Sequence, residues 1–499
     1  MPIHAPGPGA SCHNRHVQAA SYVLSVGMEV HAELLTKTKM FCRCPNEFGG
    51  EPNTRVCPVC LGLPGSLPVI NRPAVEHVLR TALALNCRIA MRSVFHRKNY
   101  FYPDLPKAYQ ISQYGETNPL GHSGYMDFFT EDGGERRVRI RRVHLEEDTG
   151  KLMHLPGRKS GVDFNRAGVP LMEIVTDYPP DIHSPQEALD YSYQLRLLLI
   201  YLGACDGKME EGSLRCEPNV SIAPEGHQEL GTKTELKNLS SFRAVQSGIR
   251  HEAERMRHAL ERGDTLKQET RGWDEENEKS YVMRVKEFED DYRYFPDPDL
   301  PPMVFSEEYI EGLRAALPEL PTAKRKRFME DLGLSDYDAR LLLAGPAWAR
   351  FFEEAVAQGG DPKQVCNWMN GDFSHLLNEA GRTAEASKVT PAHIADLTGL
   401  IASGKISGRI GKEVFEHVFQ TGRMPSDVVK EEGKEQITDA GSIREVVSEV
   451  LSQNPEAVGK YREGKKGVHG FLVGQVMRKT EGMANPEMVN RLVTEELER

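Results

Sequence analysis

The sequence predicts an α+β protein in which a strand-rich N-terminal part is followed by a helical C-terminal part. Residues 21 to about 300 contain short stretches of alternating polar and apolar residues, separated by turns rich in Gly and Pro. The segment DPDLPP, residues 297–302, then interrupts the chain, and beyond it the apolar residues recur at helical spacing. These two patterns and the break between them predict a sheet domain that precedes all-helical domains.

Helix-start signals refine this division. Ser184 is a good N-cap, Pro185 fits the first helical position and Glu187 completes a capping box, so a long helix is expected inside the sheet domain. Thr390, followed by a proline, marks another start. We expect a disordered leader over residues 1–20, a sheet domain over residues 21–300, a helical domain over residues 301–389 and a helical tail domain over residues 390–499.

Composition excludes several classes of protein. No stretch approaches the roughly 20 apolar residues of a membrane helix, and the leader lacks the apolar core of a signal peptide, so we expect a cytoplasmic protein without membrane contact. The odd count of nine Cys fits poorly with a disulfide framework. The net charge of -11 argues against nucleic-acid binding by bulk electrostatics, so any RNA contact needs a local basic patch.

Four cysteines form a C-x-C pair, Cys42 and Cys44, and a C-x-x-C pair, Cys57 and Cys60. Each pair presents two sulfurs from one turn, and a closed four-sulfur site is typical of structural zinc. A redox C-x-x-C would normally open a helix, whereas Pro64 lies in the segment that follows. The alternative is a set of cysteines without metal. Because a closed site has no open coordination position, we expect catalysis elsewhere.

Acidic and basic residues alternate with apolar ones on several predicted strands. Glu29 and His31 share one face of the first strand, and either a solvated face or a set of metal ligands explains such a row. Further carboxylates are those of Glu147, Glu211 and Glu235, and cations occur at Arg215, Lys233, Arg284 and Lys286. Carboxylates would hold Mg²⁺ and the cations would neutralise phosphate, a combination that favours phosphoryl transfer. The alternative is a set of surface salt bridges.

Basic residues also cluster near the C-terminus, where they surround the segment VHGFLVGQVM. They are Lys460, Arg462, Lys465, Lys466, Arg478 and Lys479. Such a patch can hold an RNA backbone despite the acidic net charge of the chain. The alternative is a solvated helix face.

A series of ordered segments is similar to one known family. They resemble signatures of the GatB subunit of the tRNA-dependent amidotransferase, the GatCAB complex, and include VGMEVHAEL, EPNTRVCPVCLGLPGSLPVIN, RKNYFYPDLPKAYQISQY, HLEEDTGK, VDFNRAGVPLMEIV, MEEGSLRCEPNVS, GTKTELKNLSSF, ETRGWDE and DYRYFPDPDLPP. The resemblance runs from about Tyr22 to the C-terminus.

The resemblance implies a reaction and partners. ATP phosphorylates the side-chain carboxylate of mischarged Glu-tRNA(Gln) or Asp-tRNA(Asn), and ammonia then displaces the phosphate to give Gln-tRNA(Gln) or Asn-tRNA(Asn). An amidase subunit (GatA) supplies the ammonia by hydrolysing glutamine, and a small clamp subunit (GatC) completes the heterotrimer. The whole is a glutamine-hydrolysing carbon–nitrogen ligase that uses ATP and Mg²⁺.

The resemblance also implies a fold and residue roles. The fold is a catalytic antiparallel-sheet cradle of the glutamine synthetase and guanidino kinase type, which carries the zinc-binding loop, followed by an all-α helical domain and an all-α tail domain that contacts tRNA. The magnesium ligands implied are Glu29, His31, Glu147, Glu211 and Glu235. The catalytic residues implied are Glu147, Glu211, Arg215, Lys233, Arg284 and Lys286.

Two rival functions remain open at this point. One is a free-standing ATP-dependent carboxylate–amine ligase or guanidino kinase that shares the cradle. The other is a non-catalytic scaffold that binds tRNA. Phosphorylation of free glutamate would favour the first, and the absence of tRNA-dependent ATP cleavage would favour the second.

Overall fold

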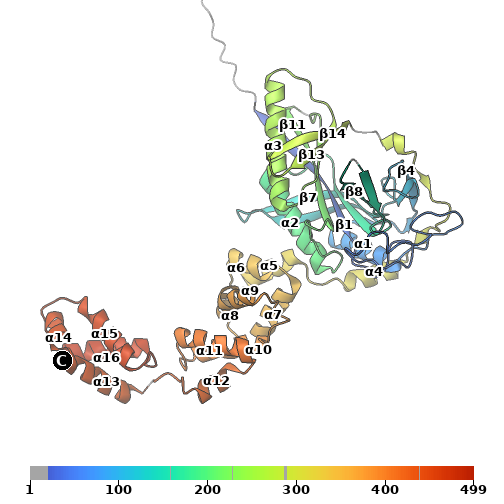
Figure 1. Ribbon diagram of the computed structural model, residues 1–499. Helices are drawn as coiled ribbons and strands as arrows, with labels where there is room; N and C mark the ends of the chain where they lie inside the picture. Colours follow the sequence, from blue (N-terminus) through green and yellow to red (C-terminus); the bar gives the residue numbers. More distant parts are fainter. Residues whose placement is uncertain (1–20, 158, 228, 286–288, 438) are drawn as a thin grey trace, which may run out of the picture. The chain divides into compact units, whose positions relative to one another are not determined.

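The computed structural model describes residues 21–157, 159–227, 229–285, 289–437 and 439–499, so the expected leader lies outside the described residues (Figure 1). The described chain divides into two compact units, the first ending at Thr322 and the second running from Ala323 to Arg499. The first unit combines a large sheet with helices, and helices build the second. The predicted α+β class is therefore confirmed.

The elements of the first unit follow one another along the chain. Its strands are β1 (Tyr22–Glu33), β2 (Arg88–Ile89), β3 (Arg92–Ser93), β4 (His96–Asn99), β5 (Tyr109–Ser112), β6 (Gly121–Phe129), β7 (Glu135–Glu147), β8 (Lys151–Leu155), β9 (Lys159–Asp163), β10 (Pro170–Thr176), β11 (Leu214–Pro224), β12 (Thr234–Lys237), β13 (Glu269–Asp274), β14 (Lys279–Val285), β15 (Phe295–Pro296) and β16 (Met303–Val304). Its helices are α1 (Arg72–Ala84), α2 (Pro185–Tyr201), α3 (Phe242–Glu261), η1 (Glu289–Tyr292) and α4 (Glu307–Ala315).

The large sheet is mixed, which corrects the expectation of an antiparallel sheet. Its strand order is β14-β13-β12-β11-β1-β10-β7-β6-β2, and every neighbouring pair is antiparallel except β12 and β13. Helix α3 connects these two strands, and parallel neighbours need such a crossover. The sequence pattern identifies the strands here but not the helix that reverses the chain between them.

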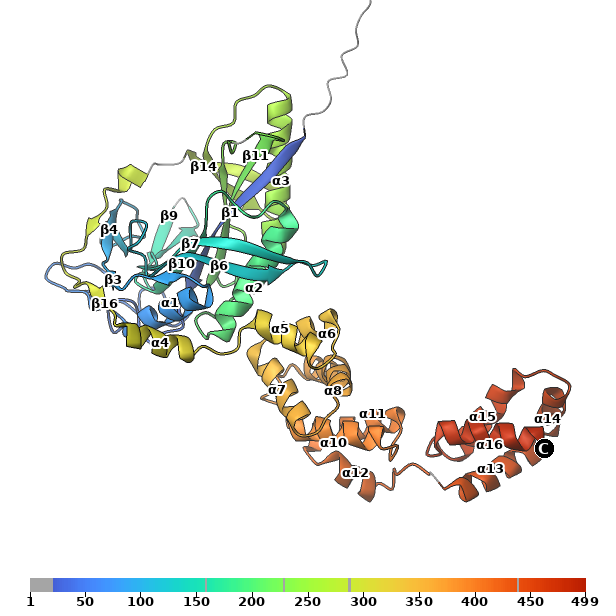
Figure 2. The ribbon, with the colours of Figure 1, turned by 180° about the vertical axis from the view of Figure 1, so that it is seen from behind.

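One face of the sheet is apolar and helices cover it. Along β1, Met28, Val30 and Ala32 are buried in the main core, which also contains residues of α1, α2 and α3. Figures 1 and 2 show these helices packed against the sheet. The opposite face of β1 carries Glu29 and His31, because side chains alternate along a strand.

Helix α2 begins as the sequence predicts. The Ser184 hydroxyl accepts a hydrogen bond from the Glu187 backbone N–H at 3.1 Å, and the Glu187 carboxylate accepts one from the His183 backbone N–H at 2.8 Å. Both contacts satisfy backbone donors at the helix start. The helix ends just before Gly203, which adopts a positive φ of 65° that favours glycine.

The second unit contains helices throughout its described length. They are α5 (Pro321–Glu330), whose first two residues belong to the first unit, α6 (Asp336–Leu342), α7 (Pro346–Ala357), α8 (Pro362–Trp368), η2 (Met369–Phe373), α9 (Ser374–Ala380), α10 (Pro391–Ala402), α11 (Gly408–Thr421), α12 (Pro425–Glu431), α13 (Ala440–Gln453), α14 (Pro455–Arg462), α15 (Val468–Lys479) and α16 (Pro486–Glu498). The Phe415 ring on α11 contacts the rings of Trp368 and Phe373, so helices on both sides of residue 390 share one core.

The last four helices have a core of their own. Residues of α13, α15 and α16 are buried in it, among them Val489, Leu492, Val493 and Leu497 of α16. Among the residues that the structure describes, no helix combines the length and the apolar composition needed to cross a membrane.

Candidate active site

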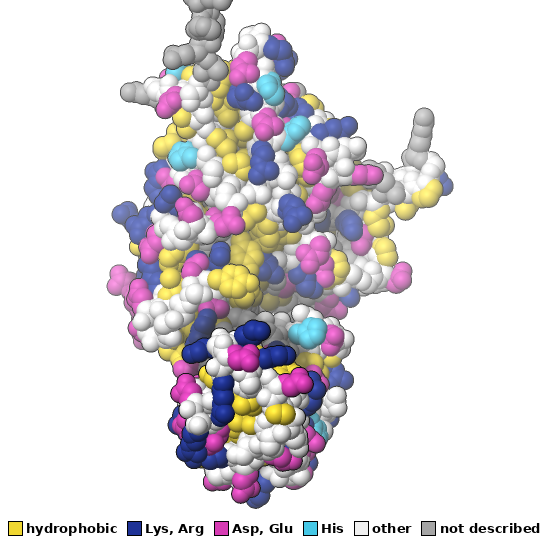
Figure 3. All heavy atoms as spheres, turned by 90° about the vertical axis from the view of Figure 1, so that its left-hand side faces the viewer, with side chains coloured by type: hydrophobic (Ala, Val, Ile, Leu, Met, Phe, Trp, Pro, Cys, Tyr) yellow, Lys and Arg dark blue, Asp and Glu magenta, His cyan; other side chains and the backbone are white. Residues whose placement is uncertain are grey.

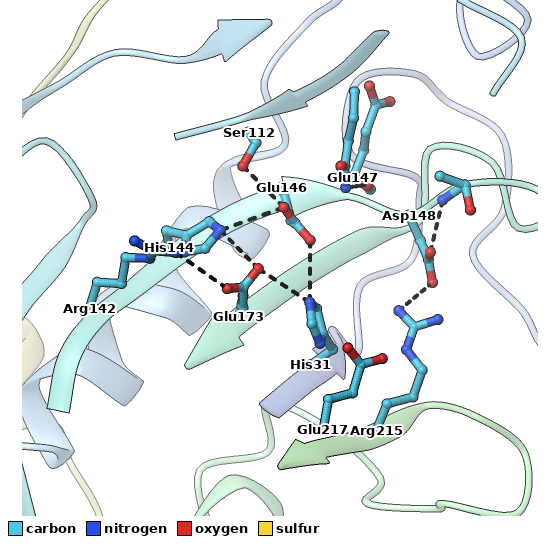
Figure 4. Close-up of polar contacts among 12 residues, drawn as sticks. His31, Ser112, Arg142, His144, Glu146, Glu147, Asp148, Glu173, Arg215 and Glu217 are labelled. Carbon is cyan, nitrogen blue, oxygen red and sulfur yellow. Dashed lines mark hydrogen bonds and ion pairs between the residues drawn. The ribbon is translucent and has the colours of Figure 1, made fainter. Parts of the chain in front are cut away.

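The polar face of the sheet gathers charged side chains from strands that are far apart in the sequence. His31 on β1 lies opposite Glu173 on β10 and, on its other side, opposite Arg215 on β11. Glu173 in turn lies opposite His144 on β7. Because these strands are neighbours in register, their side chains project from one surface into a common site (Figure 4).

Two imidazoles flank two carboxylates at the centre of this site. The His31 Nε2 atom lies 3.2 Å from a Glu173 oxygen and 3.9 Å from a Glu146 oxygen. The His144 Nε2 atom lies 3.3 Å from Glu173 and 3.5 Å from Glu146. Figure 4 shows the four side chains pointing toward one another. The Ser112 hydroxyl donates a hydrogen bond of 3.0 Å to Glu146 and holds that carboxylate in place.

The imidazoles and carboxylates of this group stabilise one another's charges. Burial would lower the pKa of His31, but the carboxylates of Glu173, Glu217 and Glu146 raise it to about 9. Burial would raise the pKa of Glu173, but His144 and His31 hold it well below its usual value. The Glu173 carboxylate is therefore ionised and His31 is protonated at neutral pH. Since a metal ligand must be a neutral imidazole, a divalent cation would displace this proton.

A second acidic group lies beside the first. Ligand atoms of Glu29, Glu217 and Glu235 lie within 4.8 Å of one another. The Lys237 ammonium lies 2.5 Å from Glu217 and 3.3 Å from Glu235, and Asn219 donates a hydrogen bond of 2.9 Å to Glu29. Burial would raise the pKa of Glu217, but Lys237 and His31 lower it. One ammonium thus neutralises part of a concentrated negative charge.

Cations and carboxylates continue toward the edge of the sheet. The Arg215 guanidinium lies 2.9 Å from Asp148, and Arg166 lies 3.6 Å from the same carboxylate. Burial would raise the pKa of Asp148, but the two guanidinium groups lower it. Burial and then the charge of Asp148 raise the pKa of Glu33 to about 8, so this carboxyl group is protonated at neutral pH.

A cleft opens beside these groups. Its volume is about 520 Å³, within the range of small-molecule sites. Its walls include Glu33, Arg215, Glu217 and Lys237 from the sheet, together with Arg166. The cleft therefore offers both carboxylates for a hard cation and guanidinium or ammonium groups for an anion.

The residues present fit a divalent cation. One ligand atom each from His31, Glu146 and Glu173 lies within 4.8 Å of the other two. The Nδ1 atoms of His31 and His144 are buried and have no hydrogen-bond partner among the residues that the structure describes. Carboxylate oxygens are the ligands that Mg²⁺ prefers, and an imidazole is a further nitrogen donor.

The side chains of the four cysteines lie close together. Their sulfur atoms lie within 4.8 Å of one another, and those of Cys57 and Cys60 are 3.9 Å apart. A tetrahedron with metal–sulfur bonds of about 2.3 Å has edges of ~3.8 Å, so the spacing fits zinc. A hydrogen bond with Cys42, followed by the Cys57 backbone and the Lys39 charge, lowers the pKa of Cys60 to about 5.

Comparisons with known proteins show which family the chain belongs to. Residues 24–311 match the family described as GatB/GatE catalytic domain, and residues 350–497 match the family described as GatB domain. The GatB subunit of aspartyl/glutamyl-tRNA(Asn/Gln) amidotransferase from Caldanaerobacter subterraneus subsp. tengcongensis is 50% identical over 96% of this chain and 100% of that protein. The chain belongs to the GatB family. The proteins of the same name from Persephonella marina and Geobacter sulfurreducens are 51% and 48% identical, over 94% and 96% of this chain and 98% and 99% of their own lengths.

The acidic residues that the sequence assigns to magnesium do not all meet in this GatB-family chain. Glu29, His31 and Glu235 lie on the polar face. The Glu147 carboxylate lies elsewhere, where it pairs with the buried Lys107 ammonium and accepts a hydrogen bond of 3.0 Å from the Ile111 backbone. Glu211 pairs with Lys208 at 2.8 Å and lines the cleft.

The predicted cations are similarly divided. Arg215 faces the cleft, as the phosphate role requires. Lys233 is exposed just before β12, and the Lys237 ammonium on that strand lies 3.3 Å from a Glu235 oxygen. The backbone of Arg284 pairs with Thr270 on β13, whereas its side chain and the whole of Lys286 lie outside the described part of the chain.

Glu146, Glu173 and His144 are the site residues that the sequence prediction does not assign. A signal for two of them exists in the segment RVHLEEDTG, because His144, Glu146 and Asp148 share the period of two that places side chains on one strand face. Glu173 gives a weaker signal, because it stands alone in the apolar strand PLMEIVT.

The predicted RNA-binding residues of this GatB-family chain lie on the surface. They are Lys460 and Arg462 in α14, Lys465 and Lys466 in the turn that follows, and Arg478 and Lys479 at the end of α15. All six are exposed, and Lys479 pairs with Glu449. Figure 3 shows Lys and Arg side chains interspersed with Asp and Glu, a mixed surface rather than a uniformly basic face.

Proposed function

We propose that this chain is the GatB subunit of an aspartyl/glutamyl-tRNA amidotransferase and performs the ATP-dependent step of the reaction. The γ-phosphoryl group of ATP is transferred to the side-chain carboxylate of Glu-tRNA(Gln) or Asp-tRNA(Asn), and ADP leaves. Ammonia then attacks the activated acyl carbon, phosphate departs, and the amide of Gln-tRNA(Gln) or Asn-tRNA(Asn) forms. The observation that carries this proposal is the carboxylate–imidazole group beside a cleft with cationic walls, in a chain 50% identical to a GatB subunit.

The carboxylates and the cationic side chains of the site would have different roles in this reaction. His31, Glu146 and Glu173 would hold Mg²⁺, which offsets the charge that develops on the transferred phosphoryl group. Arg215 and Lys237 line the cleft and would contact phosphate oxygens, since both side chains donate charge-assisted hydrogen bonds. Phosphoryl transfer depends mainly on positioning and electrostatic stabilisation, which a set of fixed side chains on a sheet can provide.

The four cysteines would bind structural zinc and so fix the loop that follows β1. Their sulfurs lie within 4.8 Å of one another, which supports this assignment. The sheet with its covering helices would correspond to the cradle of the glutamine synthetase and guanidino kinase type. The basic residues of α14 and α15 would contact the tRNA backbone in the tail.

The partners follow from the chemistry. The reaction needs ammonia, which an amidase subunit would release from glutamine, and a small clamp subunit would complete the heterotrimer. The mischarged tRNA is the substrate, and the cytoplasm is the compartment in which we expect it to be used. No membrane partner is needed.

The test is to measure ATP cleavage and amide formation by the assembled three-subunit complex with glutamine as ammonia source. Each mischarged tRNA, uncharged tRNA, and free glutamate or aspartate are supplied in separate reactions. We expect ADP and amide only with a mischarged tRNA. ADP formation with the free amino acid would indicate a free-standing ligase, and tRNA binding without ATP cleavage would indicate a scaffold; either result would overturn the proposal.

A further inference from the structure

Lys39 is a lysine without solvent exposure. It lies between β1 and the first cysteine pair, and its relative exposed area is 0%. Its ammonium donates hydrogen bonds to the backbone carbonyls of Ala167 at 2.8 Å and Phe164 at 3.2 Å. Among the residues that the structure describes, no carboxylate lies within ion-pair distance of it. The Sγ atom of Cys60 is 3.9 Å away.

A buried ammonium needs a counter-charge. Burial of an unpaired ion is costly, and two backbone carbonyls supply only partial charges. The cysteine cluster, whose Cys60 sulfur faces the ammonium, can supply a full negative charge. Four thiolates around one divalent cation carry a net charge of about −2, because the ion offsets only two of the four negative charges. Such a cluster supplies the charge that Lys39 needs.

We propose that Lys39 is the counter-cation of the four-cysteine metal site and a positioning residue that links this site to the catalytic sheet. This inference rests on the proposed metal at the cysteines. The ammonium neutralises part of the charge of the metal–thiolate cluster, and the carbonyls it contacts fix residues 164–167 against that cluster. Arg166 in this segment faces Asp148 at the cleft.

The backbone continues the link from the cysteines to the cleft. The Met40 N–H donates to the Gly168 carbonyl at 2.7 Å, and the Gly168 N–H donates to the Asp148 carbonyl at 2.9 Å. Gly168 has a φ of +85°, and a Cβ atom there would lie 3.4 Å from the Cβ atom of Cys60. The two segments therefore pack closely at this glycine, and Asp148 holds Arg215 at 2.9 Å.

The experiment compares zinc retention by the full chain carrying Lys39→Met with that of the wild type and of Lys37→Met. Met has nearly the volume of Lys but no charge, and Lys37 is an exposed lysine on the same segment. Zinc is withdrawn by a graded series of chelator concentrations and the bound metal is quantified. We expect Lys39→Met to weaken zinc retention by roughly 10–100-fold, the usual effect of removing a group that supports metal ligands, and Lys37→Met to behave like wild type.

A second measurement tests the role of Lys39 in the wild-type chain, without any substitution. Hydrogen exchange over residues 160–176 is compared in wild-type chain with and without zinc. We expect faster exchange in 164–169 after zinc removal, because the ammonium is then left without its counter-charge. Equal zinc retention by Lys39→Met and wild type, or unchanged exchange after metal removal, would overturn the role of Lys39. A wild-type chain that binds no zinc at all would instead refute the proposed metal site.

Discussion

Glu146 and Glu147 are neighbours in the chain, but their carboxylates lie in different surroundings. Glu146 contacts Ser112 and the two imidazoles on the polar face, whereas Glu147 shares the side of β7 that carries the buried Leu145. The sequence therefore identifies the strand and the chemistry, and its apolar residues identify the face. A magnesium-ligand role for Glu147 conflicts with this alternation, because its side chain points away from the polar face.

Glu147 has a measurable structural role at the residue scale. Its carboxylate and the Lys107 ammonium are both largely buried, with side-chain exposures of 3% and 8%. Replacing Glu147 with Gln leaves a buried ammonium without a charged partner. We predict that Glu147→Gln lowers the free energy of unfolding by about 3 kcal/mol, measured by denaturant titration of the full chain. A change below about 0.5 kcal/mol, the usual effect of a surface substitution, would contradict a buried ion pair.

At the scale of elements, local signals predict helix ends well. Ser184 and Thr390 both precede the helices that the sequence predicts, because capping satisfies backbone donors within one turn. The parallel pair β12 and β13 could not be predicted in this way. The chain passes through α3 between these two strands, so their pairing depends on contacts between residues that are far apart in the sequence.

Helix α10 carries a pH-sensitive cap. The backbone N–H of Thr390 donates a hydrogen bond of 2.9 Å to the Nδ1 atom of His393, which must be unprotonated to accept it. Burial lowers the pKa of His393 below its ordinary value of 6.5, although Asp396 opposes this. A folded-state pKa below the unfolded value means that stability is complete above pH 6.5 and is lost as the pH falls below it.

We predict that His393→Gln removes this pH dependence while preserving the cap, since Gln at the same position also accepts the backbone hydrogen bond. The measurement is the midpoint of thermal unfolding at pH 7.5 and pH 5.5 for wild type and variant. On acidification the wild type should lose up to about 1 kcal/mol more stability than the variant. If the unfolding midpoints of wild type and variant fall equally between pH 7.5 and pH 5.5, protonation of His393 is not linked to folding.

At the scale of the whole molecule, the net charge of -11 contrasts with the exposed basic residues of α14, α15 and the turn between them. Lys465 and Lys466 lie in that turn, whereas Lys479 already pairs with Glu449. Binding of an RNA backbone releases counterions in proportion to the phosphate charge that the protein neutralises. Lys465 and Lys466 should therefore contribute more to the salt dependence of tRNA binding than Lys479 does.

We predict that replacing Lys465 and Lys466 with Gln weakens tRNA binding by the assembled complex and reduces the slope of log affinity against log salt by about 0.7–0.9 for each phosphate that is no longer neutralised. Lys479→Gln is the matched control and should change the slope less, because its charge is already neutralised. The measurement is a salt series of tRNA binding. Equal slopes for the double variant and the wild type would place the RNA-binding surface elsewhere.

The most direct test of the catalytic site is tRNA-dependent ATP cleavage by the assembled complex carrying Glu173→Gln. Glu254→Gln, which changes an exposed carboxylate on α3, is the matched control. We predict that Glu173→Gln slows ATP cleavage by roughly 100-fold or more, with tRNA binding and glutamine hydrolysis retained, because the charge that stabilises phosphoryl transfer is lost. ATP cleavage at the control rate in Glu173→Gln would contradict a cation site formed by His31, Glu146 and Glu173.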